Sequence, residues 1–117
     1  TGWFDKLRKF GIEVHARSIF LQGILLSKHN HLPKKLIKLR RKLLVWENWL
    51  KKNKFSSLQA CLSFVLNQHQ LDGIVVGYNN TDQLNQILKS KKIKNDFFLP
   101  DLNIKNKKLI DPREWLN

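Results

Sequence analysis

The sequence has a single cysteine, three prolines and no long apolar run. A membrane-spanning helix needs about 18 or more consecutive apolar residues, and no segment approaches that length. The N-terminus lacks a secretory signal pattern. The lone thiol, Cys61, excludes an internal disulfide and falls in an apolar helical pattern, so we interpret it as a small buried hydrophobic residue. These absences favour a cytoplasmic protein.

Acidic residues are also scarce, since Lys and Arg number 22 against 9 Asp and Glu, a net charge of +13. Such a surplus is typical of proteins that bind nucleic acid or anionic membranes. The Lys- and Asn-rich composition that an AT-rich genome produces gives the same surplus without a binding face, and charge alone leaves both explanations open. The content of 42% hydrophobic and 26% charged residues is that of a folded globular domain.

Hydrophobic periodicity predicts four helices and two short strands. The helices cover residues 3–10, 33–52, 57–69 and 81–90, and the strands cover 12–16 and 73–77. Residues 19–26 read as a structured loop with a turn at Gly23. We expect one domain over residues 1–117, ending in an irregular tail at 91–117 where Asp111 caps a helical turn that begins at Pro112.

Two four-residue patterns resemble capping boxes, Ser56–Gln59 and Asn80–Gln83. In such a box the first side chain accepts a hydrogen bond from the N–H three residues on, and the glutamine side chain reaches back to the start of the helix. Both patterns coincide with the starts of helices that the periodicity predicts.

Strands separated by helices imply a parallel sheet, and ligands of such folds lie beyond the C-terminal ends of the strands. Arg17 and Ser18 follow the first strand, and Gly77–Asn80 follow the second. The free N–H groups of the next helix suit an anion, although a capped turn without a ligand shows the same pattern. His29 and His31 have no carboxylate or thiol near them in the sequence, so we predict no metal site.

Two stretches together resemble a known family: RSIFLQGILL at 17–26 and SSLQACLSFVLNQHQLDGIVVGYNNTDQLNQIL at 56–88. They are similar to the C-terminal part of the aldo-keto reductases, which are (β/α)8 barrels that bind NADP(H). The resemblance covers most of residues 3–90, and LIDPREWL near the end is similar to the end of that family. It implies an α/β fold: a partial (β/α)8 TIM barrel made of the last two or three βα units, helix-rich with two short parallel strands.

The first stretch is similar to the family's aromatic-Ser-Pro-Leu segment with its following glycine. Ser18, Phe20 and Gly23 match that pattern, while Arg17 stands where the family has the aromatic ring that stacks on the nicotinamide. The resemblance implies that all four residues contact the cofactor. Arg17 would stack through its guanidinium plane or contact a phosphate.

The second stretch is similar to the family's Gly-x-x-x-x-x-Gln loop. The resemblance implies that Gly77, Tyr78, Asn79 and Asn80 lie along the adenosine side of the dinucleotide. It also implies that Gln83 reaches the adenosine phosphate or ribose. Many members have Glu and Asn three and four residues after this glutamine. This chain has Gln86, which can still form hydrogen bonds, and then Ile87, which cannot.

The family's catalytic tetrad of Asp, Tyr, Lys and His comes from the first half of the barrel, and the only tyrosine here, Tyr78, falls in the nucleotide loop. We therefore predict no catalytic residue and no activity for this chain alone. The complete protein would transfer hydride between NADP(H) and a small carbonyl substrate, with NAD(H) left open. Exposed strand edges imply a partner, either a missing N-terminal half-barrel or further copies of this chain.

Two other functions fit the sequence. One is a small basic helical protein that binds nucleic acid or an acidic partner through the Lys and Arg residues of 34–54. The other is a non-catalytic interaction module derived from a reductase. If the chain is part of a reductase, as the resemblance implies, we expect neither nucleic acid nor a membrane as its partner.

Overall fold

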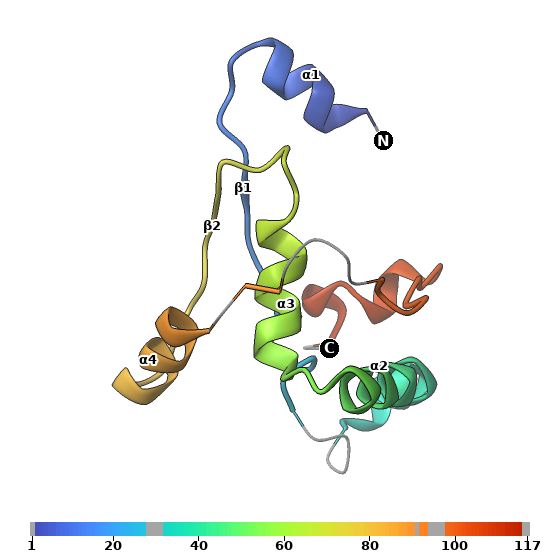
Figure 1. The fold of residues 1–117 in the computed structure, drawn as a ribbon. Coiled ribbons are helices and arrows are strands. Elements are labelled where there is room, and N and C mark those ends of the chain that lie inside the picture. The colour runs from blue at the N-terminus through green and yellow to red at the C-terminus, as the bar shows by residue number, and fades with distance from the viewer. Residues whose placement is uncertain (1, 28–31, 91, 94–97, 116–117) are drawn as a thin grey trace. The chain divides into compact units, whose positions relative to one another are not determined.

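The computed structural model describes residues 2–27, 32–90, 92–93 and 98–115, and these form two compact units (Figure 1). The first unit joins residues 1–19 to 58–95, and the second joins 20–57 to 96–117. No helix in the described ranges is long and apolar enough to cross a membrane. The elements in chain order are α1 (Trp3–Lys9), β1 (His15–Ala16), η2 (Lys34–Leu39), α2 (Arg40–Asn53), α3 (Ser57–Leu66), β2 (Gly73–Ile74), α4 (Thr81–Lys89), η3 (Lys107–Leu109) and η4 (Pro112–Trp115).

A parallel pair of strands organises the first unit, and β1 and β2 run side by side in Figure 1. His15 pairs with Gly73 and Ala16 with Ile74. The predicted parallel arrangement is confirmed, although the paired segments are shorter than the predicted 12–16 and 73–77. Each strand has a single strand neighbour among the described residues, so the ladder ends where the two segments of the chain separate.

Asp72 fixes the register of this pair at its start. Its N–H donates to the carbonyl oxygen of Val14 at 2.8 Å, and its carboxylate accepts the N–H of Val14 at 2.7 Å. At the other end the N–H of Val75 donates to the carbonyl of Ala16 at 2.8 Å. A Cβ atom on Gly73 would stand 2.9 Å from Nδ1 of His15, so the imidazole in its present position requires a glycine opposite it.

Helix α3 supplies the buried side chains of the first unit. Its buried residues are Ala60, Cys61, Leu62, Ser63 and Val65. Burial raises the pKa of the Cys61 thiol to about 12, so the thiol stays neutral at physiological pH and the predicted role as a small hydrophobic residue is confirmed. The hydroxyl of Ser63, fully buried, accepts the N–H of Ile93 at 2.8 Å and so attaches the segment after α4 to this helix.

The second unit is built on η2 and α2, where one long α-helix over 33–52 was predicted. Leu36, Leu39 and Leu43 form its buried core. The partly buried side chains around that core are Ile24, Leu25, Leu32, Ile104, Leu109 and Trp115. The first part is a 3₁₀-helix, in which three residues per turn place Leu36 and Leu39 above one another. The α-helical spacing of four then places Leu43 on the same face.

Indole groups on α2 hold two other segments of the second unit. Nε1 of Trp46 donates to the carbonyl of Leu25 at 3.1 Å, and Nε1 of Trp49 donates to the carbonyl of Phe98 at 2.8 Å. The two rings are stacked with their centroids 5.6 Å apart. The loop over 19–27 is a series of turns, as predicted, with Gly23 at φ +81°.

The tail confirms the predicted turn at Pro112. Oδ1 of Asp111 accepts the N–H of Arg113 at 3.1 Å, and the guanidinium of Arg113 reaches the same carboxylate at 2.6 Å. Hydrogen bonds from the Arg113 side chain, with a smaller contribution from its backbone N–H, lower the pKa of Asp111 to about 2.

Leu39 and Ile37 lie on the same 3₁₀-helix but differ in burial, at 2% and 58% exposed. Replacing Leu39 with alanine removes core contacts and leaves a cavity, so we expect Leu39→Ala to lower the free energy of unfolding by about 3 kcal/mol in urea denaturation. Ile37→Ala is the matched control and should change it by less than about 0.5 kcal/mol. Equal effects of the two substitutions would contradict this core.

Acid should release the C-terminal turn in a defined pH range. Because the folded pKa of Asp111 lies below its ordinary value of 3.8, the ionised carboxylate stabilises the turn fully above that value. The stabilisation is lost as the pH falls through about 2. An NMR titration of the Asp111 carboxyl carbon should show this low midpoint, and Arg113→Ala should return it towards 3.8. A midpoint near 3.8 in the parent chain would refute the contact.

Candidate functional site

The parallel register brings the two candidate segments to the same edge of the strand pair. Because Ala16 is opposite Ile74, the chain leaves β1 at Arg17 and leaves β2 at Val75 in the same direction. Arg17 and Ser18 are exposed there. Ser18 has a left-handed backbone with φ +58°, and the chain enters the second unit two residues later. Arg17 and Ser18 are therefore at the same edge of the strand pair as the residues that follow β2.

The loop Gly77–Asn80 ends in a cap of α4 that two amide side chains form. Oδ1 of Asn80 accepts the N–H of Gln83 at 2.9 Å, and Oε1 of Gln83 accepts the N–H of Asn79 at 2.8 Å. The predicted capping box is thus confirmed with one shift, because the glutamine reaches the residue before the cap and not the cap residue itself. The predicted box at Ser56–Gln59 stays a prediction.

These two bonds orient the amide groups of Asn80 and Gln83. Each amide oxygen accepts a backbone N–H, so each NH₂ group turns away from the cap as a donor. In the first turn of α4 the N–H groups of Thr81 and Asp82 have no acceptor among the described residues. The result is a cluster of donors at the positive end of a helix, which suits an anionic group, with the carboxylate of Asp82 as the opposing charge.

Gly77 contributes space to this loop and not an unusual dihedral angle. No heavy atom stands within 4 Å of the position its Cβ would take, and the glycines with positive φ in the described ranges lie elsewhere, at Gly2, Gly11 and Gly23. The backbone before α4 is therefore open to close approach. The glycine therefore permits close approach to the backbone here and is not required by a positive φ.

Helix α4 places Gln86 one turn beyond Gln83 on the same exposed face. Ile87, where the family pattern has a polar residue, is half-buried together with Leu84. Ile87 therefore lies on the less exposed side of α4, where an apolar side chain packs. Tyr78 is 53% exposed in the loop before the helix.

The ten predicted site residues divide between the two units. Eight lie in the first unit: Arg17, Ser18, Gly77, Tyr78, Asn79, Asn80, Gln83 and Gln86. Phe20 and Gly23 belong to the second unit, where Phe20 is half-buried in the series of turns. Asp72 was not predicted as a site residue, yet its two bonds to Val14 set the register of the site. Its position just before a glycine and a β-branched run was the available signal.

Metal ligands do not gather in the described part of the chain. No group of three or more His, Cys, Asp or Glu side chains there is placed to hold a metal ion. The histidine pair considered from the sequence, His29 and His31, lies outside the described residues. The described chemistry of the site is thus that of hydrogen-bond donors and one cation, Arg17.

Comparison with protein-family models identifies the class of protein. Residues 1–97 match the aldo/keto reductase family, and the chain belongs to that family. Its members are TIM-barrel oxidoreductases that generally use NAD(P)H. The helix-rich structure with two parallel strands is consistent with part of such an α/β fold. Neither the comparison with curated proteins nor that with solved structures returned a match.

Asn80 and Asn85 allow the cap of α4 to be tested with one type of substitution. Asn80→Ala removes the acceptor for the Gln83 N–H, so we expect the helix to lose about 1 kcal/mol and the Gln83 amide to lose protection in hydrogen exchange. Asn85 is exposed inside α4, and Asn85→Ala should preserve or slightly increase protection. Unchanged exchange at Gln83 in the Asn80 variant would exclude this cap.

Proposed function

We propose that this chain is the C-terminal portion of an NADP(H)-dependent oxidoreductase and carries the phosphate-binding part of its cofactor site. In the complete protein the reaction is hydride transfer between the cofactor and a small carbonyl or alcohol substrate in the cytoplasm. The observation that carries the proposal is the donor cluster at the start of α4, placed beyond the C-terminal end of a strand that pairs in parallel with β1. Family membership supplies the reaction class.

The residues at the start of α4 fit a phosphate group. The NH₂ groups of Asn80 and Gln83 and the N–H groups of Thr81 and Asp82 are donors, and phosphates bind at helix N-termini through such groups. Gly77 leaves its backbone open to the ligand. Gln86, one turn further, extends the polar face towards an adenosine. NADPH supplies the hydride when bound, and the side chains named here only bind and orient it.

The nicotinamide end is held differently from the usual family pattern. Arg17 stands where the pattern has an aromatic ring, and its exposed guanidinium lies at the same strand edge as the loop after β2. A planar cation can stack on a ring or form paired hydrogen bonds with a phosphate. We propose that Arg17 holds the cofactor by one of these contacts, with Ser18 beside it in the chain. Contacts of Phe20 and Gly23 with the cofactor stay predictions.

Catalysis in this proposal belongs to a part of the protein outside these 117 residues. The only tyrosine is Tyr78, in the loop that we assign to the nucleotide, so no residue of this chain serves as the general acid for a carbonyl oxygen. A complete (β/α)8 barrel runs to about 250 residues. We therefore propose that the chain alone does not turn over substrate.

Exposed apolar surface in the first unit supports the need for further chain. Trp3 and Phe10, at the two ends of α1, are 64% and 77% exposed, and α1 buries none of its residues. In a barrel every strand has two strand neighbours, whereas β1 and β2 have only each other among the described residues. We propose that a half-barrel, or a second copy of this chain, pairs with these strands and covers α1.

NADPH binding to the whole chain tests the proposed site, with Asn80→Asp and Asn85→Asp as a matched pair. Aspartate preserves the N-cap of α4 but places a negative charge where the phosphate would bind. We expect NADPH to shift the amide resonances of Gly77, Asn80 and Thr81 in NMR titrations. Asn80→Asp should weaken binding about tenfold through like-charge repulsion, and Asn85→Asp, on another face of α4, should leave it unchanged.

The titration also has outcomes that contradict the proposal. Absence of shifts at Gly77, Asn80 and Thr81 would remove the cofactor site from this chain. Equal weakening by Asn80→Asp and Asn85→Asp would show a general effect of charge and not a phosphate at the start of α4. Helix content of both variants, measured by circular dichroism, separates loss of binding from loss of structure.

A further inference from the structure

The outward face of the η2–α2 helix is a second surface that the cofactor site does not use. The core positions Leu39, Leu43 and Trp46 recur at spacings of four and three, and their side chains are buried within the second unit. The residues between them face outward with the same spacing. On α2 they are Arg40, Arg41, Leu44, Val45, Asn48, Lys51 and Lys52, all of them exposed. We call this set, together with Lys34, Lys35, Ile37 and Lys38 of η2, the outer face.

Charge on the outer face is of one sign. The segment 34–54 contains nine Lys and Arg and a single acidic residue, Glu47. The second unit as a whole has 14 basic and five acidic residues, a net +9 of the chain's +13, whereas the first unit has eight and four. Lys42 is the one basic residue of α2 that turns inward, where its Nζ lies 2.9 Å from the carbonyl oxygen of Asp101. The remaining basic side chains of the segment are exposed.

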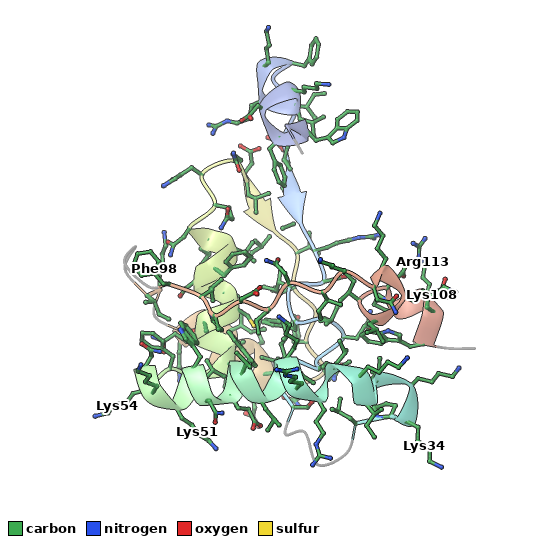
Figure 2. The ribbon with its side chains drawn as sticks, turned by 90° about the vertical axis from the view of Figure 1, so that its right-hand side faces the viewer. Lys34, Lys51, Lys54, Phe98, Lys108 and Arg113 are labelled. Carbon is green, nitrogen blue, oxygen red and sulfur yellow. The ribbon has the colours of Figure 1, made fainter. Side chains whose placement is uncertain are left out.

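The charges gather at the two ends of the helix and leave an aliphatic centre. Figure 2 shows Lys34 at one end and Lys51 and Lys54 at the other, extending from the side away from Phe98 and Arg113. About 15 Å of helix separates Arg41 from Lys51, at 1.5 Å per residue. Between them lie Leu44 and Val45, which are 45% and 40% exposed, and Ile37, one turn before Arg41, is 58% exposed.

An apolar centre with a charged rim is the anatomy of a protein–protein interface. We infer that the outer face binds an acidic protein segment, an amphipathic helix whose aliphatic side chains cover Ile37, Leu44 and Val45 and whose Asp and Glu side chains meet the basic clusters at either end. Charge complementarity selects this partner, because like charges exclude a second copy of the same face. This surface is independent of the proposed cofactor site.

Other anionic partners fit the outer face less well. Nucleic acid is contacted mainly through basic and polar side chains on its phosphates, and the centre of this face offers two aliphatic residues instead. A helix that lies in a membrane interface has a broad apolar face with Trp, Phe or Leu. Here the tryptophans Trp46 and Trp49 are turned inward, where their indoles hold Leu25 and Phe98.

A synthetic 21-residue helix with leucine along one stripe and glutamate on both sides of it is the probe for this surface. The whole chain should bind it, and the double variant Arg41→Glu, Lys52→Glu should bind it at least about tenfold more weakly. The same variant should gain affinity for a probe in which every glutamate is replaced by lysine. Lys89→Glu with Lys92→Glu reverses two exposed charges of the first unit and serves as the matched control.

The aliphatic centre is tested with two exposed leucines. Leu44→Ser should weaken binding of the acidic probe about fivefold, whereas Leu88→Ser, at a leucine 73% exposed on α4, should not. Unfolding curves of each variant exclude loss of structure. The inference is overturned if Lys89→Glu with Lys92→Glu weakens binding equally. It is also overturned if a 20-base-pair RNA duplex or phosphatidylglycerol vesicles bind more tightly than the acidic helix and are insensitive to Leu44→Ser.

Discussion

The parallel pairing of β1 with β2 is the constraint on which the candidate site depends. Asp72 and Val14 are 58 positions apart, and the two bonds between them fix which residues leave the strand pair together. A register shifted by one residue would turn the side chains of Arg17 and Ser18 to the opposite face. The pairing is also slight, since a few hydrogen bonds of about 1 kcal/mol each cannot hold an isolated two-stranded sheet. That weakness is the physical reason for the proposal that a half-barrel, or a second copy of this chain, pairs with these strands.

Helix α2 shows how one element can serve two purposes. Its inner face carries the leucines and the two indoles that organise the second unit, and its outer face is basic with an aliphatic centre. Helix geometry separates the two faces, because residues three and four apart share a side. Substitutions on the outer face can therefore test the inferred binding without disturbing the core. The segment 34–54, which spans η2 and α2, contains nine of the chain's 22 Lys and Arg residues and one of its nine Asp and Glu residues.

The amide side chains at the start of α4 show how structure refines a motif. In the sequence, Asn79, Asn80 and Gln83 are three groups that could each donate or accept. In the folded chain the oxygens of Asn80 and Gln83 are taken by backbone N–H groups, and the N–H of Asn79 is one of these. What Asn80 and Gln83 leave for a ligand is their NH₂ groups, which are donors, as an anion requires. Membership of the aldo/keto reductase family gives that set a chemical context.

The sequence by itself determined the features that depend on neighbouring residues. The helices α1 and α4, the cap at Asn80, the turn at Pro112 and the family all follow from short patterns. Tertiary structure decided the features that need a distant partner. The strands end where their ladder ends, and Leu36 and Leu39 of η2 share one core with residues far along the chain, such as Ile104 and Trp115. Arg17 and Phe20 are three residues apart but belong to different units. The unit of Arg17 includes residues 58–95, and the unit of Phe20 includes residues 96–117.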